Sequence, residues 1–222
     1  MDRNPAINRR LAAEGLGSFF LFACVIGSGI MAANLSQGND AVALLGNTMA
    51  TAAILFVLIT ILGPISGAHF NPAVTLVAAW RRDLGAGEAA GYIGIQLVFG
   101  ILGAWAAHLM FDLPTLQLSV KARTGLGQWV GEAIATFGLI FTIIGTDSIK
   151  RTWVPATVAL YITAAYWFTS STSFANPAIT VARSLTNSFA GIAPPDVPAF
   201  IMAQIVGAAT AAMAAKWLFS RS

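Results

Sequence analysis

Hydrophobic residues fall into six long runs along the chain, separated by short polar stretches. Each run is close to the length of about 20 apolar residues that a helix needs to cross a hydrocarbon core roughly 30 Å thick. The pattern therefore predicts an all-α membrane protein with six transmembrane helices. Their expected ranges are about 11–33, 41–63, 88–110, 128–147, 153–169 and 197–219.

Two shorter apolar stretches, 71–80 and 176–186, each follow a loop that is rich in glycine or serine. A ten-residue helix is about 15 Å long, roughly half the thickness of the hydrocarbon core. These stretches are too short to cross the membrane and too apolar to lie in water. We expect them to form two re-entrant half-helices.

The two halves of the chain repeat one another. The first half-helix opens with HFNPAVT at 69–75 and the second with FANPAIT at 174–180. Two pairs of polar residues recur at matching places in the spans, Glu14 with Glu132 and Gln96 with Gln204. Each half holds three spans, an odd number, so the halves must be inverted and their half-helices meet near the midplane. Inverted repeats with broken helices place the functional site there.

The repeat boundaries leave no room for a separate soluble domain. Repeat one covers about 11–110 and repeat two about 128–219, so residues 1–222 are expected to form a single domain. The first apolar run is followed by no obvious cleavage site, which favours an uncleaved first span over a signal peptide.

Basic residues indicate how the chain is oriented in the membrane. Three of the twelve, Lys121, Arg123 and Arg183, fall on or near one side of the predicted spans. The other nine fall on the opposite side: Arg3, Arg9, Arg10, Arg81, Arg82, Lys150, Arg151, Lys216 and Arg221. By the positive-inside rule, that second side and both termini are cytoplasmic.

Composition excludes most other classes of protein. Hydrophobic residues make up 57% of the chain and charged residues 9%, whereas a soluble domain carries about 25% charged residues. A soluble enzyme and a nucleic-acid-binding protein are therefore excluded, despite the net charge of +3. The single cysteine, Cys24, allows no intrachain disulfide and no cysteine-based metal cluster. We find no catalytic arrangement and no metal or cofactor site.

The Asn-Pro-Ala triplets at 71–73 and 176–178 are typical of a helix start, because asparagine is a favoured N-cap and proline is favoured at the first helical position. A third copy, at 4–6, is followed by no apolar half-helix and is assigned no function. With its side-chain oxygen occupied by a backbone N–H, each asparagine keeps its NH₂ group as a fixed donor. Each half-helix adds a partial positive charge of about +0.5 at the same place. A neutral solute accepts these hydrogen bonds while cations are repelled. The central constriction is expected at Asn71, Pro72, Ala73, Asn176, Pro177 and Ala178.

With these motifs, and with SGAHFNPAVT at 66–75, the chain resembles an aquaporin of the major intrinsic protein family over essentially its whole length. The resemblance implies an aquaporin-like hourglass pore in a right-handed six-helix bundle, and a homotetramer. The FANPAIT loop and the filter described next are similar to those of bacterial aquaporins associated with arsenic-resistance operons. That similarity suggests a bacterial inner membrane and arsenious acid as a solute.

Aquaporins usually carry an arginine directly after the second Asn-Pro-Ala, where this chain has Ile179. Ungapped spacing places the other outer-filter positions at Thr51, Ala164 and Ser173. We therefore expect a ring without aromatic, histidine or arginine side chains, wider and less polar than in water-selective or glycerol-conducting members. Arg183 lies one helical turn beyond Ile179, so its guanidinium either reaches back to the filter or lies at the interface or on loop carbonyls.

Three ionisable residues lie beside the expected loops. Glu14 and Glu132 are candidates for a proton relay, but re-entrant backbone must find its hydrogen bonds within the protein. We therefore favour a loop-bracing role for both. His69 is assigned the same role, with a pH gate as the alternative. His108 is expected at the outer membrane interface.

The sequence thus predicts a passive channel for water and small uncharged solutes, embedded in the lipid bilayer, with no cofactor and no nucleic-acid partner. One alternative is a glycerol or metalloid facilitator with little role for water. A secondary transporter and an ion channel are further alternatives. Saturation and counterflow would distinguish the transporter, and electrical conductance would distinguish the ion channel.

Overall fold

The computed structural model describes residues 5–219, which form helices joined by turns and loops. Arg3 and Arg221 lie outside the described residues. The α-helices are α1 (Ile7–Leu35), α2 (Asp40–Ser66), α3 (Pro72–Trp80), α4 (Ala86–Met110), α5 (Leu126–Lys150), α6 (Val154–Phe168), α7 (Pro177–Ser184) and α8 (Val197–Phe219). Two 3₁₀ turns, η1 (Arg151–Trp153) and η2 (Pro194–Asp196), lead into α6 and α8.

The long helices confirm the six expected spans. Five segments are long and apolar enough to cross a membrane, and one of them, Leu126–Phe168, contains both α5 and α6. The helix α6 has 15 residues and is about 22 Å long. It is the shortest of the six, and the turn η1 extends it towards α5. The half-helices α3 and α7 have 9 and 8 residues, as expected from the two short apolar stretches.

Glycines let the long helices of each repeat approach closely. A Cβ atom on Gly103 of α4 would lie 2.3 Å from the carbonyl oxygen of Phe19 in α1. In the second repeat Gly207 of α8 makes a similarly close approach, where a Cβ atom would lie 2.2 Å from the carbonyl oxygen of Ala133 in α5. Helix pairs in membranes associate through such small residues. In each repeat, a glycine therefore allows the first and third long helices to approach closely, α1 with α4 and α5 with α8.

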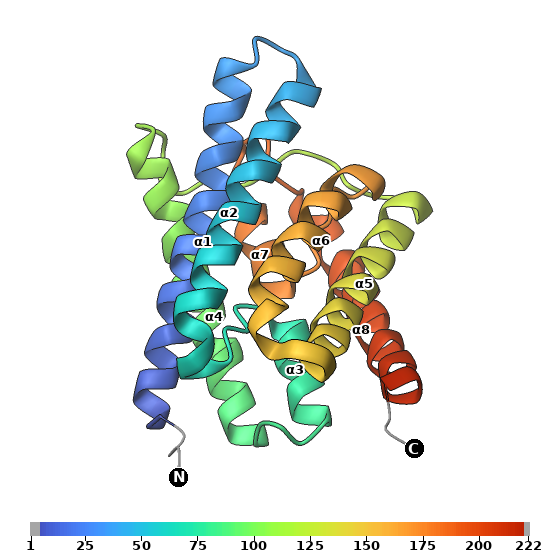
Figure 1. Cartoon of the computed structure of the whole chain (residues 1–222). Coiled ribbons are helices and arrows are strands. Elements are labelled where there is room, and N and C mark those ends of the chain that lie inside the picture. The colour runs from blue at the N-terminus through green and yellow to red at the C-terminus, as the bar shows by residue number, and fades with distance from the viewer. Residues whose placement is uncertain (1–4, 220–222) are drawn as a thin grey trace.

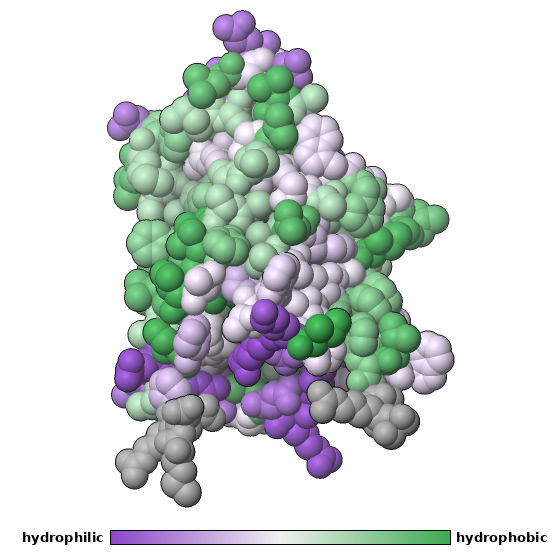
Figure 2. Space-filling view, viewed as in Figure 1, coloured by the Kyte–Doolittle hydropathy of each residue, from purple (hydrophilic) through white to green (hydrophobic). Residues whose placement is uncertain are grey.

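The two ends of the bundle differ in charge. The start of α1 and the end of α8 lie at the same end of the molecule (Figure 1). The turns after α3 and between α5 and α6, which carry Arg81, Arg82, Lys150 and Arg151, lie at that end too. In Figure 2 hydrophilic residues gather mainly at this lower end and at the upper tip, with mostly hydrophobic or neutral residues between them. That arrangement suits a bundle surrounded by lipid.

Candidate pore and selectivity site

The two half-helices begin in the same way, with an asparagine that caps the first turn. Asn71 Oδ1 accepts a hydrogen bond from the backbone N–H of Ala73 at 2.9 Å. Asn176 Oδ1 accepts from Ala178 at 2.9 Å and from Ile179 at 3.3 Å. The following proline has no N–H to satisfy, so it fits the first helical position without loss. Both side-chain oxygens are thus occupied, which fixes the direction of both NH₂ groups.

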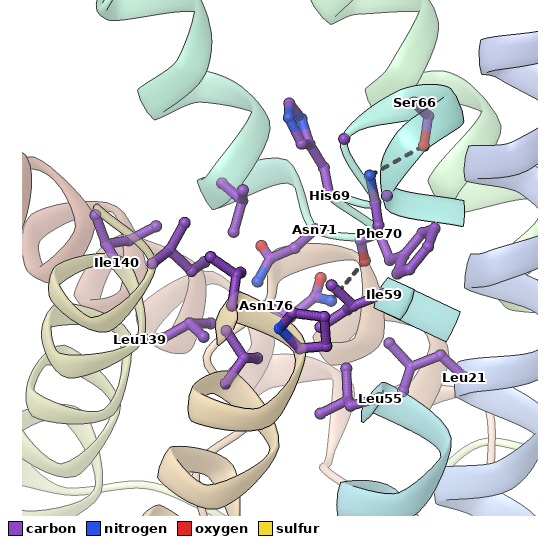
Figure 3. Close-up of a pocket in the computed structure, with 18 of the residues that line it drawn as sticks. Leu21, Leu55, Ile59, Ser66, His69, Phe70, Asn71, Leu139, Ile140 and Asn176 are labelled. Carbon is purple, nitrogen blue, oxygen red and sulfur yellow. Dashed lines mark hydrogen bonds between the residues drawn. The ribbon is translucent and has the colours of Figure 1, made fainter. Parts of the chain in front are cut away.

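The NH₂ groups of the two asparagines tie the opposing loops together. Asn71 Nδ2 donates to the carbonyl oxygen of Ala175 at 2.7 Å, and Asn176 Nδ2 donates to that of Phe70 at 2.8 Å. Each amide nitrogen carries two hydrogens, so each asparagine keeps a second hydrogen beyond the one used between the loops. Figure 3 shows the two side chains close together at the centre of the cavity.

Buried glutamates hold the two loops from behind. Glu14 accepts hydrogen bonds from the backbone N–H groups of His69 at 2.9 Å and Phe70 at 2.7 Å. Glu132 accepts from the equivalent N–H groups of Phe174 at 2.8 Å and Ala175 at 2.9 Å. Further side-chain donors complete each set, namely Ser66 and Gln96 on Glu14 and Gln204 on Glu132. The loop backbone is therefore satisfied by protein, as its depth in the membrane requires.

The loops adopt a backbone conformation that side-chain-bearing residues rarely take. Ala68 and Phe70 have φ values of 51° and 48°, and their equivalents Ser173 and Ala175 have 52° and 47°. Residues other than glycine persist in this region only where the surroundings hold them, often at functional sites. The glutamate contacts and the asparagine cross-bonds supply that constraint here.

A cavity of about 1100 Å³ runs past both asparagines. Its lining extends from Arg81 and Arg151, at the end of the bundle where α1 begins, to Arg183 near the opposite end. Apolar side chains flank the asparagines in Figure 3, with Leu21, Leu55 and Ile59 on one side and Leu139 and Ile140 on the other. The arrangement offers a solute two fixed donors within otherwise apolar walls.

Three of the expected filter residues, Thr51, Ser173 and Ile179, line this cavity. All three are buried, with 3%, 2% and 4% of their surfaces exposed. Ser173 Oγ has no hydrogen-bond partner among the described residues. A buried hydroxyl without a partner is costly, so a passing solute is a natural partner for it.

The expectation that Ala164 belongs to the outer filter is wrong. Ala164 is exposed on the outside of the bundle, and α6 faces the cavity with Val158, Ile162 and Tyr166 instead. These residues recur every fourth position on one helix face, and Ala164 lies two residues, about 200°, away from it. Ungapped counting missed this offset. The Tyr166 hydroxyl donates to Thr51 Oγ1 at 3.2 Å, so the expectation of a ring without aromatic residues is also wrong.

Arg183 combines both of the roles that its sequence position left open. Its Nε donates to the carbonyl oxygen of Ala190, and its guanidinium carbon lies 3.4 Å from the centre of the Phe174 ring. The side chain is 2% exposed and lines the cavity. The outer end of the cavity therefore does contain an arginine, held one turn beyond Ile179.

The two histidines lie in different surroundings. His69 lines the cavity, with Nδ1 3.2 Å from Thr75 Oγ1 and its ring edge-to-face with Tyr92. His108 is completely buried, and its Nδ1 lies 2.9 Å from the carbonyl oxygen of Thr115. The expectation of an interfacial His108 is wrong, because the loop that follows α4 folds back and covers it.

Six spanning helices, two opposed half-helices and a cavity that passes their capped N-termini define a membrane channel. The chain belongs to the major intrinsic protein family, whose model matches residues 2–170. The matched region contains the triplet that begins at Asn71, and the triplet that begins at Asn176 lies beyond it. The chain is a passive channel for water and small uncharged solutes.

Three comparisons support this assignment. The aquaglyceroporin AqpS from Rhizobium meliloti (strain 1021) is 54% identical over 96% of this chain and 91% of that protein. Nodulin-26 from Glycine max is 33% identical over 64% of this chain and 52% of that protein. The structure of the aquaglyceroporin from Plasmodium falciparum has a TM-score of 0.74 at 16% identity and covers 94% of this chain and 95% of that one. That last similarity concerns the fold alone.

Proposed function

We propose that this channel conducts uncharged hydroxylated solutes larger than water, with glycerol as the first example. The observation that carries the proposal is Ile179, an aliphatic residue that lines the cavity directly after the second Asn-Pro-Ala. An apolar side chain there leaves space for the carbon skeleton of a polyol. The Thr51 hydroxyl and the Ser173 hydroxyl, which has no partner among the described residues, then form hydrogen bonds with the hydroxyl groups of the solute.

In this proposal Asn71 and Asn176 form the central constriction, together with Pro72, Ala73, Pro177 and Ala178. A solute oxygen accepts the second amide hydrogen of each asparagine while the positive ends of α3 and α7 repel cations. A water molecule held by two donors cannot both accept and donate along the pore axis, so a continuous proton wire is interrupted there. Glu14, Glu132 and His69 brace the loops that carry the two asparagines, and they take no part in a chemical reaction.

Arsenious acid, As(OH)₃, is a second candidate solute. It is an uncharged trihydroxy compound, so the same apolar Ile179 and free Ser173 hydroxyl suit it. Uptake of arsenious acid into vesicles that contain the protein, compared with empty vesicles, tests this candidate. Equal uptake by both would reject it.

We also propose where the protein is located and how many copies assemble. The basic residues in the turns at the end where α1 begins support a cytoplasmic position for that end, and so for both termini. The similarity to a bacterial protein supports a bacterial inner membrane. The many exposed apolar side chains, among them Leu160 at 69% and Met202 at 64%, leave ample surface for lipid and for the neighbours in a homotetramer.

Replacing Ile179 by arginine tests the filter. We expect Ile179→Arg to lower glycerol permeability by about tenfold and to lower water permeability less. A change of this size is usual when a binding pocket loses a small amount of space for one of two competing solutes. The measurement is light scattering from vesicles after a glycerol gradient. Ile179→Val, which keeps an aliphatic side chain, is the control and should retain glycerol permeability. Unchanged glycerol permeability in Ile179→Arg would count against the assignment of Ile179 to the filter.

A further inference from the structure

A second cavity lies beyond the outer filter and gathers positive charge. It has a volume of about 270 Å³, and three of its lining side chains, Lys121, Arg123 and Arg183, are basic. Asp40 is the one acidic residue in its lining. Arg183 also lines the main cavity, so this outer vestibule opens beside the filter.

The arginines of the vestibule are held in place by neutral groups. Arg123 donates from Nε to the carbonyl oxygen of Gly191 at 2.8 Å and from Nη1 to that of Ser171 at 3.1 Å. Its guanidinium carbon lies 4.9 Å from the centre of the Phe174 ring, the ring on which Arg183 also lies. Among the described residues, none of the three basic side chains forms a salt bridge. Their positive charges are therefore positioned but not neutralised.

The acidic groups nearby are engaged elsewhere. The Glu132 carboxylate accepts the backbone N–H groups of Phe174 and Ala175. Asp196 accepts the backbone N–H of Arg123 at 2.7 Å rather than its side chain. Asp40 begins α2 and is exposed. Three cations thus face one exposed carboxylate at the pore mouth.

Hydrogen-bond donors remain available to a ligand at this place. Among the described residues, the Arg183 side chain bonds only through Nε, to Ala190, so its terminal nitrogens keep their donors. Lys121 Nζ uses one of three donors, on the carbonyl oxygen of Phe189 at 2.9 Å. Ser173 Oγ, in the main cavity that Arg183 also lines, is buried and has no hydrogen-bond partner among the described residues. Guanidinium and ammonium donors together match the several acceptor oxygens of an oxyanion.

We propose that the outer vestibule binds a small oxyanion, through Lys121, Arg123 and Arg183, directly in front of the filter. The site goes beyond the proposed passage of neutral solutes, because its ligand is charged and is held by residues outside the central constriction. Since Arg183 is shared with the main cavity, a bound anion obstructs the mouth. External oxyanion therefore slows the entry of neutral solutes.

The site depends on pH through Lys121. Partial burial, and then the charges of Arg123 and Arg183, lower the pKa of Lys121 to about 8, against a smaller opposing effect of Asp40. Lysine is charged below its pKa, so most of the positive charge of Lys121 is present at pH 7 and most of it is lost at pH 9. Burial lowers the pKa of Arg123 only to about 10, so Arg123 stays charged over this range. Affinity for the anion therefore falls as the pH rises from 7 to 9.

Sulfate is the probe, since it remains a dianion over this pH range. Its binding to the purified full chain in detergent is measured by isothermal titration calorimetry, which does not require conduction. The test variant is Lys121→Gln, and the matched control is Lys150→Gln. Both lysines lie over an aromatic ring, Lys121 4.6 Å from the centre of Phe189 and Lys150 5.7 Å from that of Trp153, but Lys150 ends α5 at the opposite end of the bundle.

We expect Lys121→Gln to weaken sulfate binding by about tenfold, as loss of a charged hydrogen bond does, and to remove most of its pH dependence. Lys150→Gln should bind sulfate like the unaltered protein. No saturable binding to the unaltered protein, or equal weakening by both variants, would overturn the proposal. Because binding is measured without flux, failure here is distinct from failure of the proposed transport.

A second measurement separates a dissolved anion from a lipid headgroup. In vesicles of phosphatidylcholine alone, external sulfate should slow glycerol entry, and Lys121→Gln should relieve that effect. If phosphatidylglycerol slows glycerol entry while sulfate does not, the oxyanion is the phosphate of a headgroup. If neither slows it while binding is observed, the bound anion leaves the mouth open, and the obstruction stated above is wrong.

Discussion

At the scale of the residue, each pore asparagine has two roles that separate substitutions can distinguish. Its Oδ1 caps a half-helix, and its Nδ2 joins the opposing loop. Asn39 caps α2 in the same way, because its Oδ1 accepts from Ala41 and Val42. Among the described residues its side chain makes no hydrogen bond to either pore loop. Asn39 is therefore a natural reference for capping alone.

We expect Asn176→Ala to lower thermal stability and also to change glycerol permeability, because it removes the cap and the hydrogen bond to Phe70. Asn39→Ala should lose about 0.5–2 kcal/mol of stability, the usual cost of a lost N-cap, and keep its glycerol permeability. Thermal unfolding in detergent and vesicle light scattering measure the two effects. If the two variants had the same permeability, the direct role of Asn176 in the pore would be contradicted.

The helix-capping role of Asn71 and Asn176 follows from local chemistry, since a cap involves only residues two or three positions away. The bonds between the loops could not be predicted, because they depend on how two segments about 105 residues apart meet. Ala164 shows the same limit. Counting from the second asparagine assumed a loop of fixed geometry, whereas the rotation of α6 decides that Tyr166 and not Ala164 faces the cavity.

At the scale of the element, the hydrophobic pattern predicted every helix because each length is set by the membrane or by half of it. What it could not predict is which faces of the helices touch. Gly103 and Gly94 both lie in α4, and in the sequence they look alike. Only the packing distinguishes them, since Gly103 lies against the backbone of α1 and nothing lies within 4 Å of a Cβ atom placed on Gly94.

These two glycines form a matched pair for a stability test. We expect Gly103→Ala to destabilise the protein by about 1–3 kcal/mol through overpacking against the Phe19 carbonyl. Gly94→Ala should be neutral or slightly stabilising, because alanine favours the helix. Thermal unfolding in detergent compares them. Equal stability of the two variants would mean that α1 and α4 do not approach as closely as described.

At the scale of the whole molecule, the distribution of charge is the basis for our proposal that the end where α1 begins and α8 ends lies in the cytoplasm. This proposal is tested by labelling single cysteines in intact cells after Cys24→Ser removes the native thiol. We expect a membrane-impermeant maleimide to label Leu118→Cys, in the exposed loop before α5, and to label Thr152→Cys only after permeabilisation. The reverse pattern would invert the assigned topology and place the vestibule of Lys121 in the cytoplasm.

A glycerol gradient across vesicles shows whether the protein forms a wide pore for neutral solutes. Vesicles that contain the protein first shrink as water leaves and then swell again as glycerol enters, and light scattering follows both phases against empty vesicles. A wide outer filter predicts fast re-swelling. Fast shrinkage followed by re-swelling no faster than that of empty vesicles would contradict it, and would mean that Arg183 and Tyr166 close the space beside Ile179.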